Sequence, residues 1–318
     1  MQCPVHKLKT DYQNTGVFDF TNKGYLTGLK KFRKNYIVPI EKEKNQETLS
    51  NFKKITKPFI LRRLKSDKNI IKDLPDKIVN DVYCNLSKEQ VALYKETLDS
   101  SIREVEENEG MKRKGLVLKL INSLKQICNH PSQFTKNKHL SIEESGKMEV
   151  LMNILENILE SGEKVLIFTQ YVQMGEIIQK FAEEKFSQEV LFLHGSQSRK
   201  KRDDMIDRFQ RNPQNKIFII SLKAGGTGLN LTAAQNVIHY DLWWNPAVEN
   251  QATDRAYRIG QKENVMVYRF ITKGTFEEKI NDMIQNKEEL AKLTVGSGET
   301  FITEMDTKDL KDMLKLRK

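Results

Sequence analysis

The hydrophobic pattern of the chain changes character near its middle. Up to about residue 161, apolar residues recur at helical spacing with Lys and Arg between them. From residue 163 onward, short continuous apolar runs alternate with helical stretches, and such runs are typical of parallel strands buried on both faces. These runs predict strands at Lys164–Thr169, Val190–Leu193, Lys216–Ser221, Asn236–Tyr240 and Val265–Ile271. The alternation predicts an α/β fold, with a parallel sheet, flanking helices and right-handed crossovers.

The first half is predicted to be a mostly helical region. Its strongest apolar stripes lie at Leu116–Cys128 and Lys147–Leu159, and Ser87 with Gln90 forms a capping box at the start of another helix. An alternating, β-branched stretch at Lys77–Asn85 predicts one short strand. Most of these stripes indicate core packing, and this half shows no catalytic constellation.

Polar and glycine-rich segments follow four of the predicted strands of the second half. In parallel α/β sheets, ligands gather beyond the carboxyl ends of the strands. We therefore expect these four segments to form one surface: Thr169–Gln170, His194–Ser196, Ser221–Asn230 and Asp241–Pro246.

The third segment, SLKAGGTGLNL, is the most informative of the four. Gly225, Gly226 and Gly228 permit close approach of the backbone, and amides exposed there can bind phosphate oxygens. The segment is not a dinucleotide fingerprint, since Leu231 stands where the last glycine should be, and it lacks the Lys-Ser or Lys-Thr of a P-loop. A plain tight turn is the alternative interpretation.

Near residue 250 the sequence QATDRAYRIGQ, Gln251–Gln261, offers candidate chemistry. A helix is predicted over Ala247–Tyr257, and if the stretch Gln251–Gln261 is helical, Gln251, Arg255 and Arg258 share one face. Two guanidiniums so close together suit the charge that develops on a transferring phosphoryl group. The alternative is an exposed, salt-bridged helix end.

Composition narrows the class of partner. The net charge of +10 favours a polyanion, with nucleic acid ahead of membrane, and no apolar run approaches membrane-spanning length. The three scattered cysteines indicate a reducing compartment: the cytoplasm or nucleoid of a prokaryote, or the nucleus of a eukaryote. Cys3 with His6, and Cys128 with His130, suggest metal ligands, but the spacing of the second pair is poor for zinc and no second CxxC motif occurs, so no metal ligands are assigned.

Taken in order, the motifs resemble the second RecA-like lobe of the Swi/Snf-type ATPases of helicase superfamily 2. VLIFTQY resembles motif IV, LHGSQSRKKR motif IVa, SLKAGGTGLNL motif V, and QATDRAYRIGQ motif VI. PFILRRLKSD, DLPDK and QICNHP match the helical insertion of the family. The resemblance implies four parts: the end of a first lobe or a linker (1–22), the insertion (23–145), a RecA-like lobe (146–295) and a C-terminal tail or brace (296–318).

The resemblance also implies a first lobe outside this chain. No G-x-x-x-x-G-K-[ST] motif and no DEAH-like box occurs, so the chain looks like a C-terminal half, either an expressed fragment or a split gene product. The first lobe would hold most of the ATP and Mg²⁺. The family's arginine fingers fall on Arg255 and Arg258, and its nucleotide contacts on Gln251 and Gly228. Double-stranded DNA would lie against Thr169, Gln170, Gly195, Lys223, Ala224 and Gly225.

These assignments imply half of an ATP-driven translocase of duplex DNA, and the chain alone would hydrolyse almost no ATP. One alternative is a non-hydrolysing DNA-binding or regulatory module that acts in trans on another ATPase. A second alternative is a Rossmann-type enzyme, which the broken glycine fingerprint argues against.

Overall fold

The structure is a computed structural model, and it describes residues 24–26, 28–41, 45–59, 74–137, 140–221, 229–285 and 302–317. Its contacts divide the chain into two units, Met1–Lys72 and Asp73–Lys318. The division lies at a different place from the predicted domain limits at 22, 145 and 295, which stay predictions.

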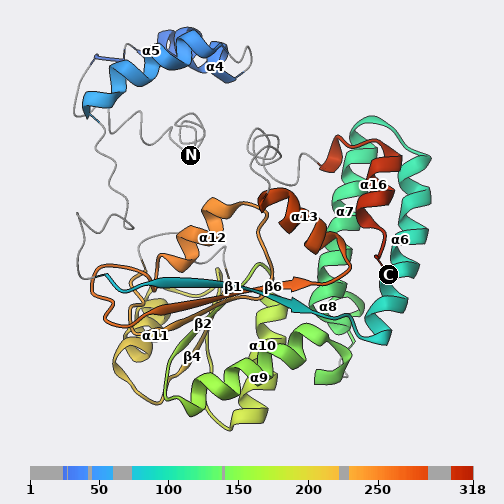
Figure 1. Cartoon of the computed structure of the whole chain (residues 1–318), viewed down its shortest axis with the longest axis vertical. Coiled ribbons are helices and arrows are strands. Elements are labelled where there is room, and N and C mark those ends of the chain that lie inside the picture. The colour runs from blue at the N-terminus through green and yellow to red at the C-terminus, as the bar shows by residue number, and fades with distance from the viewer. Residues whose placement is uncertain are drawn as a thin grey trace. The chain divides into compact units, whose positions relative to one another are not determined.

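The second unit is built on a six-stranded parallel sheet with the order β1-β6-β5-β2-β4-β3 (Figure 1). Continuous burial along β2 and β4 explains their unbroken apolar runs. The strands are β1 Lys77–Cys84, β2 Val165–Thr169, β3 Leu191–Leu193, β4 Ile217–Ser221, β5 Asn236–His239 and β6 Val265–Thr272. The predicted α/β class with a parallel, RecA-like sheet is confirmed.

Two helical layers cover the sheet, and the alternation of side chains along each strand assigns them. Val165 and Ile167 face a core built with α9 and α10, whereas Leu166 and Phe168 face a core built with α11 and α12. The helices are α9 Gly146–Glu160, α10 Val172–Phe186, α11 Arg199–Arg211 and α12 Pro246–Thr253. Both faces of the sheet are therefore buried along the central strands β2 and β4, whereas the edge strand β1 exposes Ile78, Val79 and Tyr83.

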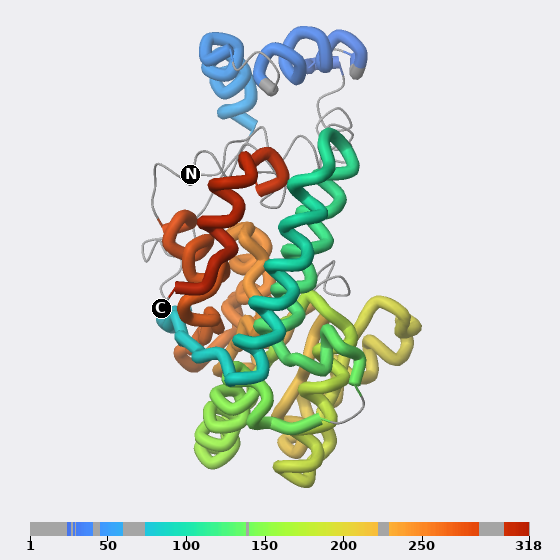
Figure 2. Tube along the Cα trace, turned by 90° about the vertical axis from the view of Figure 1, so that its right-hand side faces the viewer, coloured from blue at the N-terminus to red at the C-terminus, as the bar shows by residue number. Residues whose placement is uncertain are grey.

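A third core lies beside the sheet, between an antiparallel helix pair and the C-terminal helices (Figure 2). The pair is α6 Lys88–Glu106 and α7 Gly110–Asn129, and α13 Phe276–Gln285 and α16 Thr307–Leu314 pack against it. The hydroxyl of Tyr94 on α6 donates to the carbonyl of Leu314 at 2.7 Å. Short elements complete the unit: α8 Pro131–Thr135 and the 3₁₀ turn η3 Ile142–Glu144.

The first unit is a small helical hairpin with a core of three buried residues, Phe32, Ile40 and Phe52. The aromatic rings of Phe32 and Phe52 lie 5.8 Å apart between their centroids. Its elements are α3 Leu29–Phe32, the π-helical turn η1 Arg33–Ile37, α4 Val38–Glu41, α5 Gln46–Thr56 and the 3₁₀ turn η2 Lys57–Phe59.

One strand has a partner that the sequence pattern did not indicate. The predicted strand near Lys77 forms β1, which pairs in parallel with β6 from Lys77 opposite Val265 to Cys84 opposite Thr272. A segment that precedes the predicted lobe by about sixty residues therefore forms one edge of its sheet.

Candidate nucleotide and nucleic-acid interface

The carboxyl ends of β3, β4, β2 and β5 lie side by side, as the strand register shows. Leu193 pairs with Ile220, Thr169 with Ser221, and Phe168 with His239. The predicted segments that follow β2, β3 and β5 thus leave the sheet at one edge. This is the edge where α/β proteins bind ligands.

Asp241 joins the segments that follow β2 and β5. Its carboxylate accepts hydrogen bonds from the Thr169 hydroxyl at 2.5 Å and from the Gln170 backbone N–H at 2.8 Å. The Gln170 side chain donates in turn to the carbonyl of Leu242 at 2.8 Å. Burial raises the pKa of Asp241, and the bonds from Thr169 and Gln170 lower it again in part.

Thr169 and Gln170 are both engaged in hydrogen bonds within the protein. Thr169 is completely buried, and its hydroxyl is engaged by Asp241. Gln170 is partly exposed, with both its backbone N–H and its side-chain amide bonded to the neighbouring segment. The Thr169 hydroxyl thus joins the segment after β2 to the segment after β5, and the predicted contact of both residues with DNA stays a prediction.

The predicted helix over Ala247–Tyr257 is too long, because α12 ends at Thr253. Beyond it the Arg255 N–H bonds to the Ala252 carbonyl three residues back, and the Arg255 carbonyl accepts from the N–H of Leu231 at 3.0 Å. The predicted common helical face for Gln251, Arg255 and Arg258 is therefore wrong. The arginines instead lie in a turn that is bonded to the chain just beyond the glycine-rich segment.

Arg255 lies in a cluster of cations. It is 8% exposed, and its pKa is lowered by burial and by the positive charges of Arg202 and Arg258. Among the residues that the structure describes, no carboxylate forms an ion pair with any of these three. A buried guanidinium near like charges favours an anion as its partner.

Arg202 was not among the predicted nucleotide contacts, although LHGSQSRKKR contains it. It lies in the first turn and a half of α11, the helix whose N-cap is Ser198. The spacing of this motif alone did not show that α11 brings Arg202 close to the turn at 254–260. In the fold, the positive charge of Arg202 helps to lower the pKa of Arg255.

His239 connects β5 to the end of α12. Its Nε2 lies 2.9 Å from the Thr253 hydroxyl, and its ring stacks on Phe168. Burial, together with the positive charges of Arg269 and Lys77, lowers its pKa from 6.5 to about 3. The neutral ring thus supports the point where the arginine turn begins.

The remaining predicted residues are placed as follows. Gly195 lies exposed beyond β3, and a Cβ added there would meet no atom within 4 Å. Gln251 is exposed on α12, and Arg258 is exposed in the turn. Four predicted residues lie outside the described residues: Lys223, Ala224, Gly225 and Gly228.

Within the described ranges, no group of three or more His, Cys, Asp and Glu residues is arranged to hold a metal ion. The arginine cluster suits a phosphate group and would repel Mg²⁺.

No helix among the described residues is both long enough and apolar enough to cross a membrane.

The parallel sheet and the segments at its carboxyl edge define a RecA-like lobe, and comparisons with known proteins agree. Residues 146–260 match the helicase conserved C-terminal domain, and residues 4–133 match the SNF2-related domain. The chain is 44% identical over 302 residues to Bacillus subtilis YwqA, whose name describes an ATP-dependent helicase or translocase, with 94% of this chain and 32% of the relative covered. It is 35% identical over 289 residues to the yeast ISWI chromatin-remodeling complex ATPase ISW2, with 86% and 25% covered.

Solved structures of SWI2/SNF2 ATPases are also similar to this chain. The Sulfolobus solfataricus SWI2/SNF2 ATPase C-terminal domain is 43% identical, with a TM-score of 0.67, 76% of this chain covered and 100% of that chain. The core of the Sulfolobus ATPase in complex with dsDNA is 44% identical, with a TM-score of 0.70 and coverages of 93% and 62%. The chain belongs to the SWI2/SNF2 ATPase family. It spans about a third of the length of YwqA and a quarter of that of ISW2.

Proposed function

We propose that this chain supplies the second motor lobe of an ATP-dependent translocase of double-stranded DNA. In this proposal ATP and Mg²⁺ are held mainly by a first RecA-like lobe outside the chain, and Arg255 and Arg258 reach the phosphates from the opposite side. The observation that carries the proposal is the buried Arg255, which lies among like charges without a carboxylate partner within the described residues.

The arginine cluster can stabilise the charge of a phosphoryl group in transfer. A guanidinium keeps its proton at any pH of interest and presents planar donors that match phosphate oxygens. Arginine fingers of this kind raise turnover by about 10³-fold or more. Gln251 and Gly228 would contact the nucleotide at the same interface, and Arg202 adds a third positive charge to it.

The carboxyl edge of the sheet would hold the phosphate backbone of the DNA. Candidate contacts are the backbone at Gly195 and the residues Lys223, Ala224 and Gly225, with Thr169 and Gln170 acting through their bonds to Asp241. Amides and lysines bind phosphates without reading bases, so binding is expected to be independent of sequence and weaker at high salt. The relative solved with dsDNA supports this ligand.

The test is ATP turnover by the chain joined to a first lobe that carries a P-loop, with and without duplex DNA. We expect negligible turnover by the chain alone and DNA-stimulated turnover by the joined protein. Arg258→Ala should remove about 10³-fold of the stimulated rate. Arg211→Gln is the matched control, because Arg211 is 81% exposed and pairs with Asp207.

Turnover by the isolated chain that Arg258→Ala abolishes would contradict the proposal. Duplex binding that persists while the joined protein shows no turnover would instead favour a DNA-binding module that acts in trans.

A further inference from the structure

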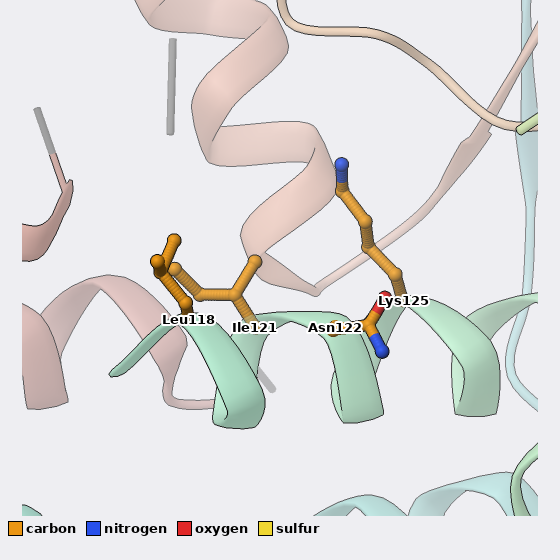
Figure 3. A pocket seen from close by; sticks show the side chains of 4 residues that line it. All are labelled: Leu118, Ile121, Asn122 and Lys125. Atoms are coloured by element: carbon orange, nitrogen blue, oxygen red, sulfur yellow. The ribbon is translucent and has the colours of Figure 1, made fainter. Parts of the chain in front are cut away.

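One face of α7 reaches both segments that meet at the carboxyl edge of the sheet. Asn122, Lys125 and Asn129 are spaced by three and four residues, so they share that face. Figure 3 shows Asn122 and Lys125 on this helix, beside Leu118 and Ile121. We call Asn122, Lys125 and Asn129 the α7 polar stripe. Each of its members contacts a different residue of the edge.

The first and last members make hydrogen bonds. The Tyr171 hydroxyl donates to Asn122 Oδ1 at 2.8 Å, and Asn129 Nδ2 lies 3.4 Å from Asp241 Oδ2. Asn129 is completely buried, and its backbone carbonyl accepts from the Tyr240 hydroxyl at 2.9 Å. The stripe therefore contacts the segment after β2 at Tyr171 and the segment after β5 at Asp241.

Lys125, the middle member of the stripe, packs against Trp244, a residue with a strained backbone conformation. The Lys125 ammonium lies 3.6 Å from the centroid of the Trp244 ring, and Phe276 meets the same ring edge-on at 5.6 Å. Trp244 is 4% exposed and has a φ of 45°, a left-handed conformation that is rare for a large side chain. Such a conformation persists only where its surroundings hold it in place, and Lys125 is part of those surroundings.

We propose that the α7 polar stripe is a positioning device that holds the segment after β2 in the arrangement that DNA binding requires, directly at Tyr171 and indirectly through Asp241 and Trp244 of the segment after β5. This inference rests on the proposed function, and it assigns to Asn122, Lys125 and Asn129 a role in DNA binding without contact to DNA. A helix outside the sheet would thereby control the affinity of the edge. Lys125 acts through Trp244, and Asn129 through Asp241.

A pocket of about 250 Å³ opens on the same face of α7, and Asn122 and Lys125 form part of its wall with Leu118 and Ile121 (Figure 3). Leu118 is 40% exposed there. A group placed in this pocket would press on two of the three stripe residues. The pocket thus gives a second, independent way to disturb the stripe.

The first test compares Lys125→Met with Lys119→Met in this chain. Lys119 is an exposed lysine of the same helix, so its loss removes the same charge without touching Trp244. Amide hydrogen exchange at 169–171 and 241–244 should rise in Lys125→Met and Asn129→Ala, and not in Lys119→Met. Affinity for a random duplex should fall about fivefold in Lys125→Met, the size expected for a lost cation–π contact, and Lys125→Arg should restore it.

The salt dependence separates positioning from direct contact. Lys125→Met should leave the slope of log affinity against log salt unchanged, because Lys125 faces Trp244. A slope reduced by about one would show a phosphate contact and overturn the inference. Unchanged hydrogen exchange in Lys125→Met and Asn129→Ala would overturn it as well, whether or not DNA binds. Absence of duplex binding by the unmodified chain would count against the proposed function alone.

The second test fills the pocket. A bulky thiol reagent on Leu118→Cys, in a Cys3→Ser background where Cys84 and Cys128 are buried, should raise exchange at both edge segments and weaken DNA binding. The same reagent on Met111→Cys, at a site 85% exposed two turns away on α7, should change neither. Equal effects at the two positions would contradict a specific role for the stripe.

Discussion

Lys147 and Arg255 are both buried cations of the same unit, and their surroundings are opposite. Lys147 is 1% exposed and lies 2.8 Å from the carboxylate of Glu277. Burial alone would lower the pKa of Lys147, but Glu277 raises it above its ordinary value. Arg255 forms no ion pair with a carboxylate of the described residues, and burial together with the positive charges of Arg202 and Arg258 lowers its pKa. The Lys147 charge is paired with a carboxylate inside the fold. In the proposed function, the Arg255 charge is paired with a phosphate group of a bound ligand.

Two buried residues of the same charge can therefore have different roles, one in the stability of the fold and the other in function. A buried ion pair that links α9 to α13 holds the fold together, and its loss should be measured in stability. An unpaired buried cation adds nothing to stability, and its loss should be measured in turnover. The predictions below test whether the two residues divide in this way.

The largest expected change in stability follows from breaking the Lys147 pair. Glu277→Gln keeps an acceptor for the Thr272 N–H but leaves Lys147 as an unpaired buried charge. The free energy of unfolding should fall by about 3–5 kcal/mol, as measured by urea denaturation.

The control for this prediction is the double variant Lys147→Met/Glu277→Gln. Because it removes the unpaired charge, it should recover part of the loss. A double variant that is less stable than Glu277→Gln would show that Lys147 acts through packing rather than charge.

A smaller effect is expected from His239, and it depends on pH. Since the pKa of His239 is about 3 in the folded state and 6.5 unfolded, the unfolded state binds the proton more readily. Its stabilising contribution is complete above pH 6.5 and is lost as the pH falls toward 3. Between pH 7 and pH 5 the wild type should lose about 2 kcal/mol more than His239→Gln. Parallel pH profiles of the two proteins would refute this.

The smallest effect is expected at the surface of α11. Arg211 is 81% exposed and pairs with Asp207 one helical turn away at 2.8 Å. Arg211→Gln should change the free energy of unfolding by less than about 0.5 kcal/mol, as measured by thermal denaturation. A loss comparable to that of Glu277→Gln would mean that surface pairing supports the fold as much as the buried pair does.

The limits of the strands could be predicted from the local sequence. β2, β4, β5 and β6 were predicted to within a residue or so, because burial on both faces requires continuous apolar runs. The strand β1 was predicted, but its partner β6 was not, since pairing across 188 residues leaves no local pattern.

The site could be predicted only in part, for the same reason. The arginines were identified from their motif, but the predicted helix ends at Thr253, and beyond it the Arg255 carbonyl accepts a hydrogen bond from the Leu231 N–H. The contacts of Lys147 with Glu277 and of Lys125 with Trp244 join elements far apart in the chain. Tertiary contacts of this kind override local propensity.

The most direct test of an unpaired Arg255 is to compare the unfolding free energy of Arg255→Met with that of the wild type, and to measure DNA-stimulated turnover of the joined protein beside it. Met keeps the apolar packing of the Arg stem and removes the charge. We expect a free energy of unfolding that is unchanged or slightly higher, with stimulated turnover reduced about 10³-fold. A loss of stability as large as that of Glu277→Gln, or turnover that survives the substitution, would contradict this expectation.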